Sequence, residues 1–190
     1  MPALIEANDV KRKMYFEHEN TPFYCMDVEV STPTARGGQT LVRLKMRNLL
    51  TGAVFDKTFK ASEKFKEPDL EEVEASYLYS DSQGSNFLDQ QSFDTLSLSE
   101  ETMGDSLGFL EEGAIVKLLK FNGDPISLVL PEKVELTVKY TEPGARGDTS
   151  GAATKLARLD TGLEIKVPLY IEIGTRVRVD TATREFAGRA

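Results

Sequence analysis

The segment FYCMDVEVSTPTARGGQTLVRLKMR, residues 23–47, contains two runs in which apolar and polar residues alternate. A period of two residues is typical of β-strands that bury one face. The apolar faces are predicted to be Tyr24, Met26, Val28 and Val30 in the first run and Val42, Leu44 and Met46 in the second. The opposite faces carry Asp27 and Glu29, together with Cys25, in the first run and Arg43 and Lys45 in the second. Because facing charges of opposite sign stabilise paired strands, this segment predicts a long antiparallel hairpin.

The tip of this hairpin reads TPTARGGQT, residues 32–40, and places Arg36 after a proline and before two glycines. A guanidinium offers a fork of donors that matches phosphate oxygens. Pro33 restricts the approach to the tip, and Gly37 and Gly38 allow the backbone to come close to a ligand. The tip is therefore a candidate phosphate-binding site. The alternative is an ordinary loop, since glycines favour loops and loops often carry arginines.

Residues 48–59 are predicted to form two short strands joined at Thr51 and Gly52, which would complete a small barrel. The polar stretch 61–72 contains Pro68 and predicts a domain boundary. His18, the single histidine, lies in the polar run FEHENT and is predicted to be a loop residue.

The next part of the chain predicts strands over 74–80 and 85–89, a helix within 96–113 and a hairpin over 114–130. Ser99 is a good helix N-cap, and Gly113 stands where a C-terminal glycine belongs. Met103, Leu107 and Leu110 are expected to share one helix face. Asn122 and Gly123 supply the positive φ angles of a tight hairpin turn. Strand, strand, helix and hairpin suit a five-stranded oligonucleotide-binding (OB) barrel.

The last sixty residues alternate again around a glycine-rich loop, PGARGDTSGAA, at 143–153. Pro168 inside a strand-like run predicts an edge strand or a bulge. The fold class is therefore all-β, with three consecutive small β-barrel domains at 1–64, 65–129 and 130–190.

Composition limits the partners and compartments. One cysteine permits no internal disulfide, and with one histidine it cannot build a thiolate or imidazole metal site. No apolar run is long enough to span a bilayer and no secretory leader is apparent, so a cytoplasmic location is expected. Basic against acidic residues number nine to seven in 1–60, four to fifteen in 61–130 and ten to nine in 131–190. The acidic middle is either a solvated surface that aids solubility or a face that keeps one side of the molecule off phosphates.

Signatures of an enzyme are mostly absent. The run GDTSG at 147–151 superficially resembles a nucleophilic serine setting, but nothing in the sequence places a general base beside Ser150. Glu71, Glu72 and Glu74 form a charge run, which is not expected to contain a catalytic acid pair. Arg176 and Arg178, like Arg43 and Lys45, are either contacts for RNA phosphates or solvated strand faces.

The segment KLARLDTGLEIKVPLYIEIG, residues 155–174, carries a family resemblance. It reproduces every fixed position of the C-terminal signature of the bacterial elongation factor P family: Lys155, Ala157, Gly162, Ile165, Val167, Pro168, Ile171 and Gly174. Further family-like blocks are NLLTG at 48–52, YLYSD at 77–81, NGDPIS at 122–127, TEPGARGDTSG at 141–151 and the closing VDTATREF. The chain resembles this family, either its main factor or the elongation-factor-P-like paralogue, over essentially its whole length.

The resemblance implies an SH3-like or KOW-like barrel followed by two OB-folds, in an L shape that imitates transfer RNA. It implies a monomeric, non-enzymatic factor without cofactor or membrane contact, which binds the 70S ribosome between the P and E sites and rescues ribosomes stalled on consecutive prolines. Arg36 would meet the CCA end of the P-site peptidyl-tRNA at the peptidyl-transferase centre. Pro33, Thr34, Ala35, Gly37 and Gly38 would support it. Gly147, Asp148 and Thr149 would approach messenger RNA at the E site.

The tip departs from the common family sequence, which reads PGKG where this chain has PTARGG. Lysine modification cannot occur at Arg36, and the loop is longer than in the common form. We expect the longer loop to compensate for an unmodified side chain. The alternative is rhamnosylation of Arg36 by an arginine-modifying enzyme, as in some relatives. Two other functional classes remain open: a general RNA-binding or ribosome-assembly protein, and a hydrolase that uses Ser150.

Overall fold

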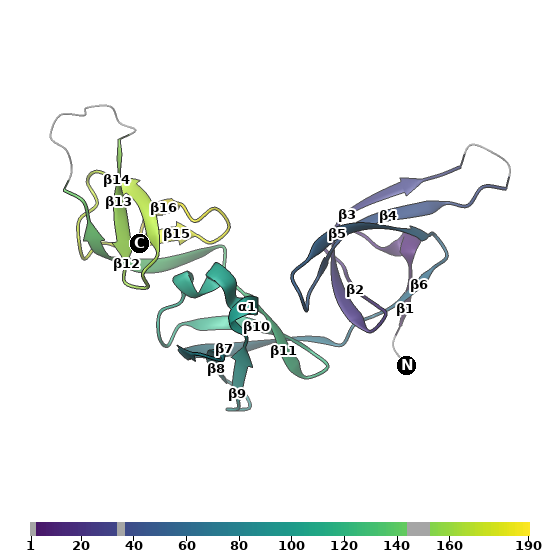
Figure 1. Ribbon diagram of the computed structural model, residues 1–190, viewed down its shortest axis with the longest axis horizontal. Helices are drawn as coiled ribbons and strands as arrows, with labels where there is room; N and C mark the ends of the chain where they lie inside the picture. Colours follow the sequence, from purple (N-terminus) through teal and green to yellow (C-terminus); the bar gives the residue numbers. More distant parts are fainter. Residues whose placement is uncertain (1–2, 34–36, 144–152) are drawn as a thin grey trace. The chain divides into compact units, whose positions relative to one another are not determined.

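The computed structural model describes residues 3–33, 37–143 and 153–190. All of its sheets are antiparallel, and there are three of them in the described chain (Figure 1), which confirms the all-β class. The chain divides into two compact units, Met1–Glu72 with Leu119–Ser127 and Val73–Leu118 with Leu128–Ala190. In the described part of the chain, no helix is long and apolar enough to cross a membrane.

The first sheet has six strands in the order β1-β6-β2-β3-β4-β5. Its strands are β1 Leu4–Glu6, β2 Tyr15–His18, β3 Thr21–Ser31, β4 Leu41–Asn48, β5 Val54–Lys60 and β6 Lys64–Lys66, with a 3-10 turn, η1, at Ala7–Asp9. The sheet curls around an aromatic core, in which the rings of Phe16 and Phe65 lie 4.7 Å apart. Val42, Leu44 and Met46 of β4 are fully buried in this core, as their alternation predicted.

The predicted apolar face of β3 is wrong in its first half. A bulge between Cys25 and Asp27 shifts the register, so that Phe23 and Cys25 enter the core while Tyr24 and Met26 are only half-buried. A bulge adds one residue to a strand and so reverses which side chains face inward. Beyond the bulge, Val28 packs against the core as predicted.

The two short strands predicted over 48–59 are one strand, β5, after a turn. The side-chain oxygen of Asn48 accepts hydrogen bonds from the backbone N–H of Leu50 at 2.8 Å and of Thr51 at 3.1 Å. Gly52 adopts a φ of +74°. Asparagine stabilises turns by bonding to the backbone two or three residues ahead. These contacts end β4 at Asn48 and direct the chain into β5.

The middle sheet has the strand order β11-β10-β7-β8-β9. Its strands are β7 Leu70–Asp81, β8 Gly84–Asp89, β9 Thr95–Leu98, β10 Ile115–Phe121 and β11 Asp124–Val129. The predicted tight turn of the second hairpin is confirmed, with φ angles of 51° at Asn122 and 89° at Gly123.

The helix predicted within 96–113 is short. The α-helix α1 spans Glu100–Met103, and a 3-10 helix, η2, continues over Gly104–Phe109. Ser99 is the N-cap as predicted, since its side chain accepts from the backbone N–H of Thr102 at 3.2 Å. Gly104, not Gly113, ends the α-helix, with φ 46° and ψ −130°. The tighter 3-10 winding turns Leu107 outward, so it does not share the buried face of Met103 and Leu110.

The third sheet has the order β14-β13-β12-β15-β16. Its strands are β12 Lys133–Thr141, β13 Thr154–Leu159, β14 Glu164–Pro168, β15 Arg176–Asp180 and β16 Phe186–Arg189. Pro168 ends the edge strand β14, as predicted. Numbered within each sheet, both five-stranded sheets have the order 3-2-1-4-5. They are therefore two copies of one topology.

Candidate functional site

The β3–β4 hairpin pairs its charges as the sequence predicted. Asp27 lies opposite Lys45 and Glu29 opposite Arg43. Arg43 lies 3.9 Å from the carboxylate of Glu29 and 3.6 Å from that of Asp56 on β5. These side chains are exposed, and exposed ion pairs contribute at most about 1 kcal/mol each. The pairs therefore support the register of the hairpin more than the stability of the sheet.

The far end of this hairpin leaves the core. Val42 is fully buried, whereas Val30 is 52% exposed and Leu41 is 41% exposed. Figure 1 shows β3 and β4 continuing side by side beyond the rest of the first sheet. The last paired residues are Ser31 and Leu41. The hairpin is thus an arm that carries the segment after it away from the packed residues of its own sheet.

The tip begins at this end of the arm. Pro33, Gly37 and Gly38 are described, and Gly37 has a φ of 92° with no atom within 4 Å of a built Cβ. Glycine is needed there for the backbone angle and not for contact with the rest of the chain. Thr34, Ala35 and Arg36 lie outside the described residues, so the role of Arg36 stays a prediction.

A shallow hollow of about 230 Å³ lies on the outer face of the arm. Its lining consists of Asp27, Glu29, Arg43, Lys45 and Asp56, all charged. Asp56 was not predicted to belong here, although the alternation in VFDKTF could have placed it on this face. Because acids flank the bases on both sides, the hollow suits polar surfaces and not an apolar ligand.

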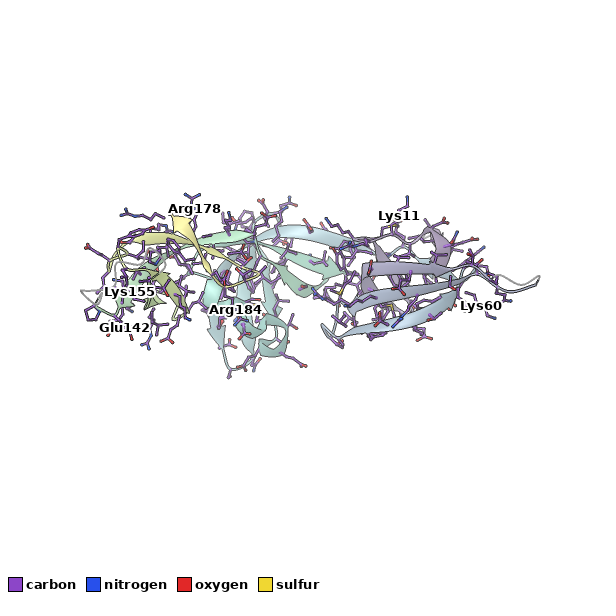
Figure 2. The ribbon with its side chains drawn as sticks, turned by 90° about the horizontal axis from the view of Figure 1, so that it is seen from above. Lys11, Lys60, Glu142, Lys155, Arg178 and Arg184 are labelled. Carbon is purple, nitrogen blue, oxygen red and sulfur yellow. The ribbon has the colours of Figure 1, made fainter. Side chains whose placement is uncertain are left out.

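The loop of the third sheet is described only at its ends. Gly147, Asp148 and Thr149, and also Ser150, lie outside the described residues. On the strands that lead to the loop, the hydroxyl of Thr141 donates to the carbonyl oxygen of Leu156 at 3.2 Å. Figure 2 shows Glu142 and Lys155 at this end of the sheet. Tyr140 is 56% exposed nearby.

The arginines of β15 are engaged within the protein. Arg178 donates to the carbonyl oxygen of Arg189 from Nη2 at 2.7 Å and from Nε at 3.1 Å. Arg176 Nη2 lies 3.4 Å from the carboxylate of Glu111, and its Nε lies 3.5 Å from that of Glu135. These contacts favour the interpretation of both residues as strand-face side chains.

The prediction that His18 lies in a loop is wrong. It is the last residue of β2, its side chain is 15% exposed, and its ring packs edge-on against Phe59 and Phe65. Its Nε2 lies 3.1 Å from Nζ of Lys57.

Burial raises the pKa of the Cys25 thiol, which disfavours its reactive thiolate. Within 3–33, 37–143 and 153–190 no cluster of three or more side chains could hold a metal ion.

Comparisons with known proteins cover the whole chain. Three models of elongation factor P regions match it: the KOW-like domain over residues 6–65, the OB domain over 70–128 and the C-terminal region over 134–189. Elongation factor P of Oleidesulfovibrio alaskensis is 40% identical over 186 residues, which are 98% of this chain and 100% of the relative. Elongation factor P of Aquifex aeolicus is 38% identical over 189 residues, which are 100% of this chain and 97% of the relative.

Two solved structures resemble the fold. Eukaryotic translation initiation factor 5A from Methanococcus jannaschii has a TM-score of 0.55 and 18% identity, and the match covers 67% of this chain and 94% of that one. A translation initiation factor eif-5a family protein from Naegleria fowleri has a TM-score of 0.51 and 17% identity, over 68% of this chain and 96% of that one. At these identities the likeness concerns the fold alone.

Proposed function

The chain belongs to the elongation factor P family of non-catalytic, ribosome-binding translation factors, and we propose that it relieves ribosomes stalled on consecutive prolines by positioning the P-site peptidyl-tRNA with Arg36. In this proposal the factor binds between the P and E sites. The observation that carries it is the β3–β4 arm, whose end lies outside the packed core and leads directly into the Arg36 tip.

The physical basis is orientation. The ring of proline is rigid and its imino nitrogen is poorly placed, which leaves the reacting groups misaligned. Holding two reacting groups in a near-attack geometry can lower a barrier by several kcal/mol without any added chemical group. A guanidinium at the tip supplies charge-assisted hydrogen bonds to the phosphates of the CCA end. The ribosome then forms the bond, and the factor takes no chemical part in it.

The test is a stalling reporter that compares a proline-run message with a matched message lacking the run. Arg36→Ala should lower the yield from the proline-run message about 10- to 100-fold, since a desolvated charge-assisted contact contributes about 1.5–3 kcal/mol. Gln39→Ala, an exposed neutral residue in the same loop, is the control and should behave as wild type. Equal rescue by wild type and Arg36→Ala would overturn the proposal and favour a general RNA-binding protein with affinity spread over many bases.

The state of Arg36 is a separate part of the proposal. Each residue added to the tip extends its reach by at most about 3.6 Å, and by less when the two arms of a hairpin share it. We take this to compensate for an unmodified side chain. The intact mass of protein from the native host should equal the sequence mass, whereas a surplus of one deoxyhexose would show rhamnosylation by an arginine-modifying enzyme.

For the third sheet we propose that Gly147, Asp148 and Thr149 contact messenger RNA at the E site. Small residues with backbone donors suit single-stranded RNA. Replacement of the three residues by Ala-Ala-Ala should reduce rescue on messages that carry different E-site codons to different extents. The same loss on every codon would contradict a contact with the messenger.

A further inference from the structure

The two five-stranded sheets differ between their third and fourth strands. In the middle sheet this interval, from β9 to β10, contains α1 and η2. In the third sheet it is residues 169–175, a stretch the structure describes in full and in which it shows turns and no helix. The third sheet thus lacks the helical segment that packs against the core of its counterpart.

The helical segment of the middle sheet contacts both cores. Met103 and Leu110 are buried in the core of the middle sheet, at 2% and 5% exposure. Phe109, the residue before Leu110, is 4% exposed but belongs to the core of the third sheet, together with Leu136 and Val138 of β12. Consecutive side chains on an extended backbone point in opposite directions, and Leu110 has φ −107° and ψ 117°. The segment can therefore fill two cores at once.

Polar contacts hold the same segment against the third sheet. The hydroxyl of Thr161 donates to the carbonyl oxygen of Gly108 at 2.6 Å. A Cβ built on Gly108 would lie 3.4 Å from Cδ1 of Leu163, so the backbone of the segment lies directly against that side chain. Asp105 pairs with Arg184, which Figure 2 labels on the connection between β15 and β16.

A third contact lies just after the segment. Glu111 accepts from Arg176 at 3.4 Å and also faces Asp160. Burial and the neighbouring Asp160 raise the pKa of Glu111, and Arg176 opposes this effect.

We propose that the buried side chains of Met103, Phe109 and Leu110 form a shared plug, in which Phe109 completes the core of the third sheet and fixes that sheet on the middle one. Phe109, Gly108 and Thr161 are then positioning residues, because they hold the third sheet in place for binding to a partner. On the function proposed above, on which this last step rests, the plug sets where the third sheet meets the ribosome.

The test uses the full chain and amide hydrogen exchange. Phe109→Ala removes a buried ring and leaves a cavity that is only partly refilled. The lower stability should reduce or abolish the protection of backbone amides against exchange. Exchange in β12–β16 should rise by about 100-fold or more, with little change in β1–β6. Leu107→Ala, an exposed residue of the same segment, is the control and should leave exchange unchanged. Unchanged protection of the third sheet in Phe109→Ala would overturn the proposal.

Two milder variants serve if Phe109→Ala does not fold. Phe109→Leu should restore most of the protection, and Thr161→Val should raise exchange in β12–β16 selectively, because it removes the bond to Gly108 without opening a cavity. If Thr161→Val leaves exchange in β12–β16 unchanged, the plug is refuted.

The stalling reporter separates the plug from the proposed function. Phe109→Ala should lose rescue on proline-run messages while Leu107→Ala keeps it. A wild-type reporter result for Arg36→Ala would refute the tip mechanism but would leave the exchange result, and hence the plug, intact.

Discussion

The middle and third sheets share one strand order, yet their equivalent outer positions carry different chemistry. Each first strand has a bulge, after Tyr77 in β7 and after Val138 in β12. The residue that follows each bulge is an exposed tyrosine, Tyr79 or Tyr140, at 57% and 56%. In the register, Tyr79 faces Asn86 and Tyr140 faces Arg158.

The next strand extends the contrast. Asn86 accepts a hydrogen bond from Ser97 of β9 at 2.6 Å, and the equivalent Arg158 forms a 2.8 Å ion pair with Glu164 of β14. Asn86 is 9% exposed, whereas Arg158 has an exposed side chain. One topology therefore tolerates a buried, hydrogen-bonded amide in one copy and a solvated ion pair in the other. The apolar residues beside them, Phe87 and Leu159, are fully buried in both. Topology follows the apolar pattern, and the surface chemistry varies independently of it.

The largest difference between the two copies is expected at the start of the second strand. A Cβ built on Gly84 would lie 2.1 Å from the carbonyl oxygen of Leu98, and Gly84 has a φ of 145°. At the equivalent position the third sheet has Leu156, which is 40% exposed. Gly84→Ala should therefore destabilise the protein by about 3 kcal/mol or more, because backbone must move.

Leu156→Ala is the matched variant and should cost less than about 1 kcal/mol. Urea unfolding followed by far-UV circular dichroism measures both free energies. Equal costs would show that the close approach at Gly84 relaxes easily and that the two copies are alike at this point.

A second prediction compares the hydrogen bonds of Asn86 with the ion pair of Arg158. Asn86→Ala leaves the hydroxyl of Ser97 and the carboxylate of Asp81 without this partner, and Asp81 accepts from Asn86 at 3.2 Å. Loss of one partner from a buried network costs about 1–3 kcal/mol. Arg158→Ala breaks an exposed ion pair, for which about 0–1 kcal/mol is expected.

Salt distinguishes these two variants. The free energy of unfolding lost in Arg158→Ala should shrink in 1 M NaCl, where exposed charges are screened over about 3 Å, while that lost in Asn86→Ala should not. An effect at Asn86 that depends on salt as strongly as the effect at Arg158 would contradict its assignment as a buried amide whose cost comes from lost hydrogen bonds.

The sequence could predict the elements whose signals are local. The Asn122-Gly123 turn, the Ser99 cap and the charge pairing of β3 with β4 follow from neighbouring residues, and the structure confirms all three. The bulge that turns Cys25 inward could not be predicted, because alternation alone does not mark an inserted residue.

Contacts between residues far apart in the chain also could not be predicted from the sequence. Phe109 is not part of the helix face predicted from Met103, Leu107 and Leu110, and nothing local shows that it enters the core of another sheet. Arg184 and Asp105 are 79 positions apart. The candidate site also has a part that local pattern predicts and a part that it does not. The β3–β4 arm could be predicted from alternation, whereas the role of Arg36 rests on family resemblance.

The smallest predicted effect concerns pH and the contact between the two sheets. Glu111 has a raised pKa when folded, so its contribution to stability is present at low pH and is lost as pH rises through that raised value. The groups that face it are Asp160, which favours protonation, and Arg176, which opposes it.

Glu111→Gln keeps a neutral hydrogen-bonding side chain at every pH. Relative to wild type, this variant should therefore gain stability as pH rises above the ordinary carboxyl pKa of 4.5, by less than about 1 kcal/mol because the site is partly exposed. Glu112→Gln, its exposed neighbour, controls for the loss of one negative charge. Urea unfolding at each pH measures the difference, and a flat or falling difference for Glu111→Gln would mean that the carboxyl pair does not weaken the junction between the sheets.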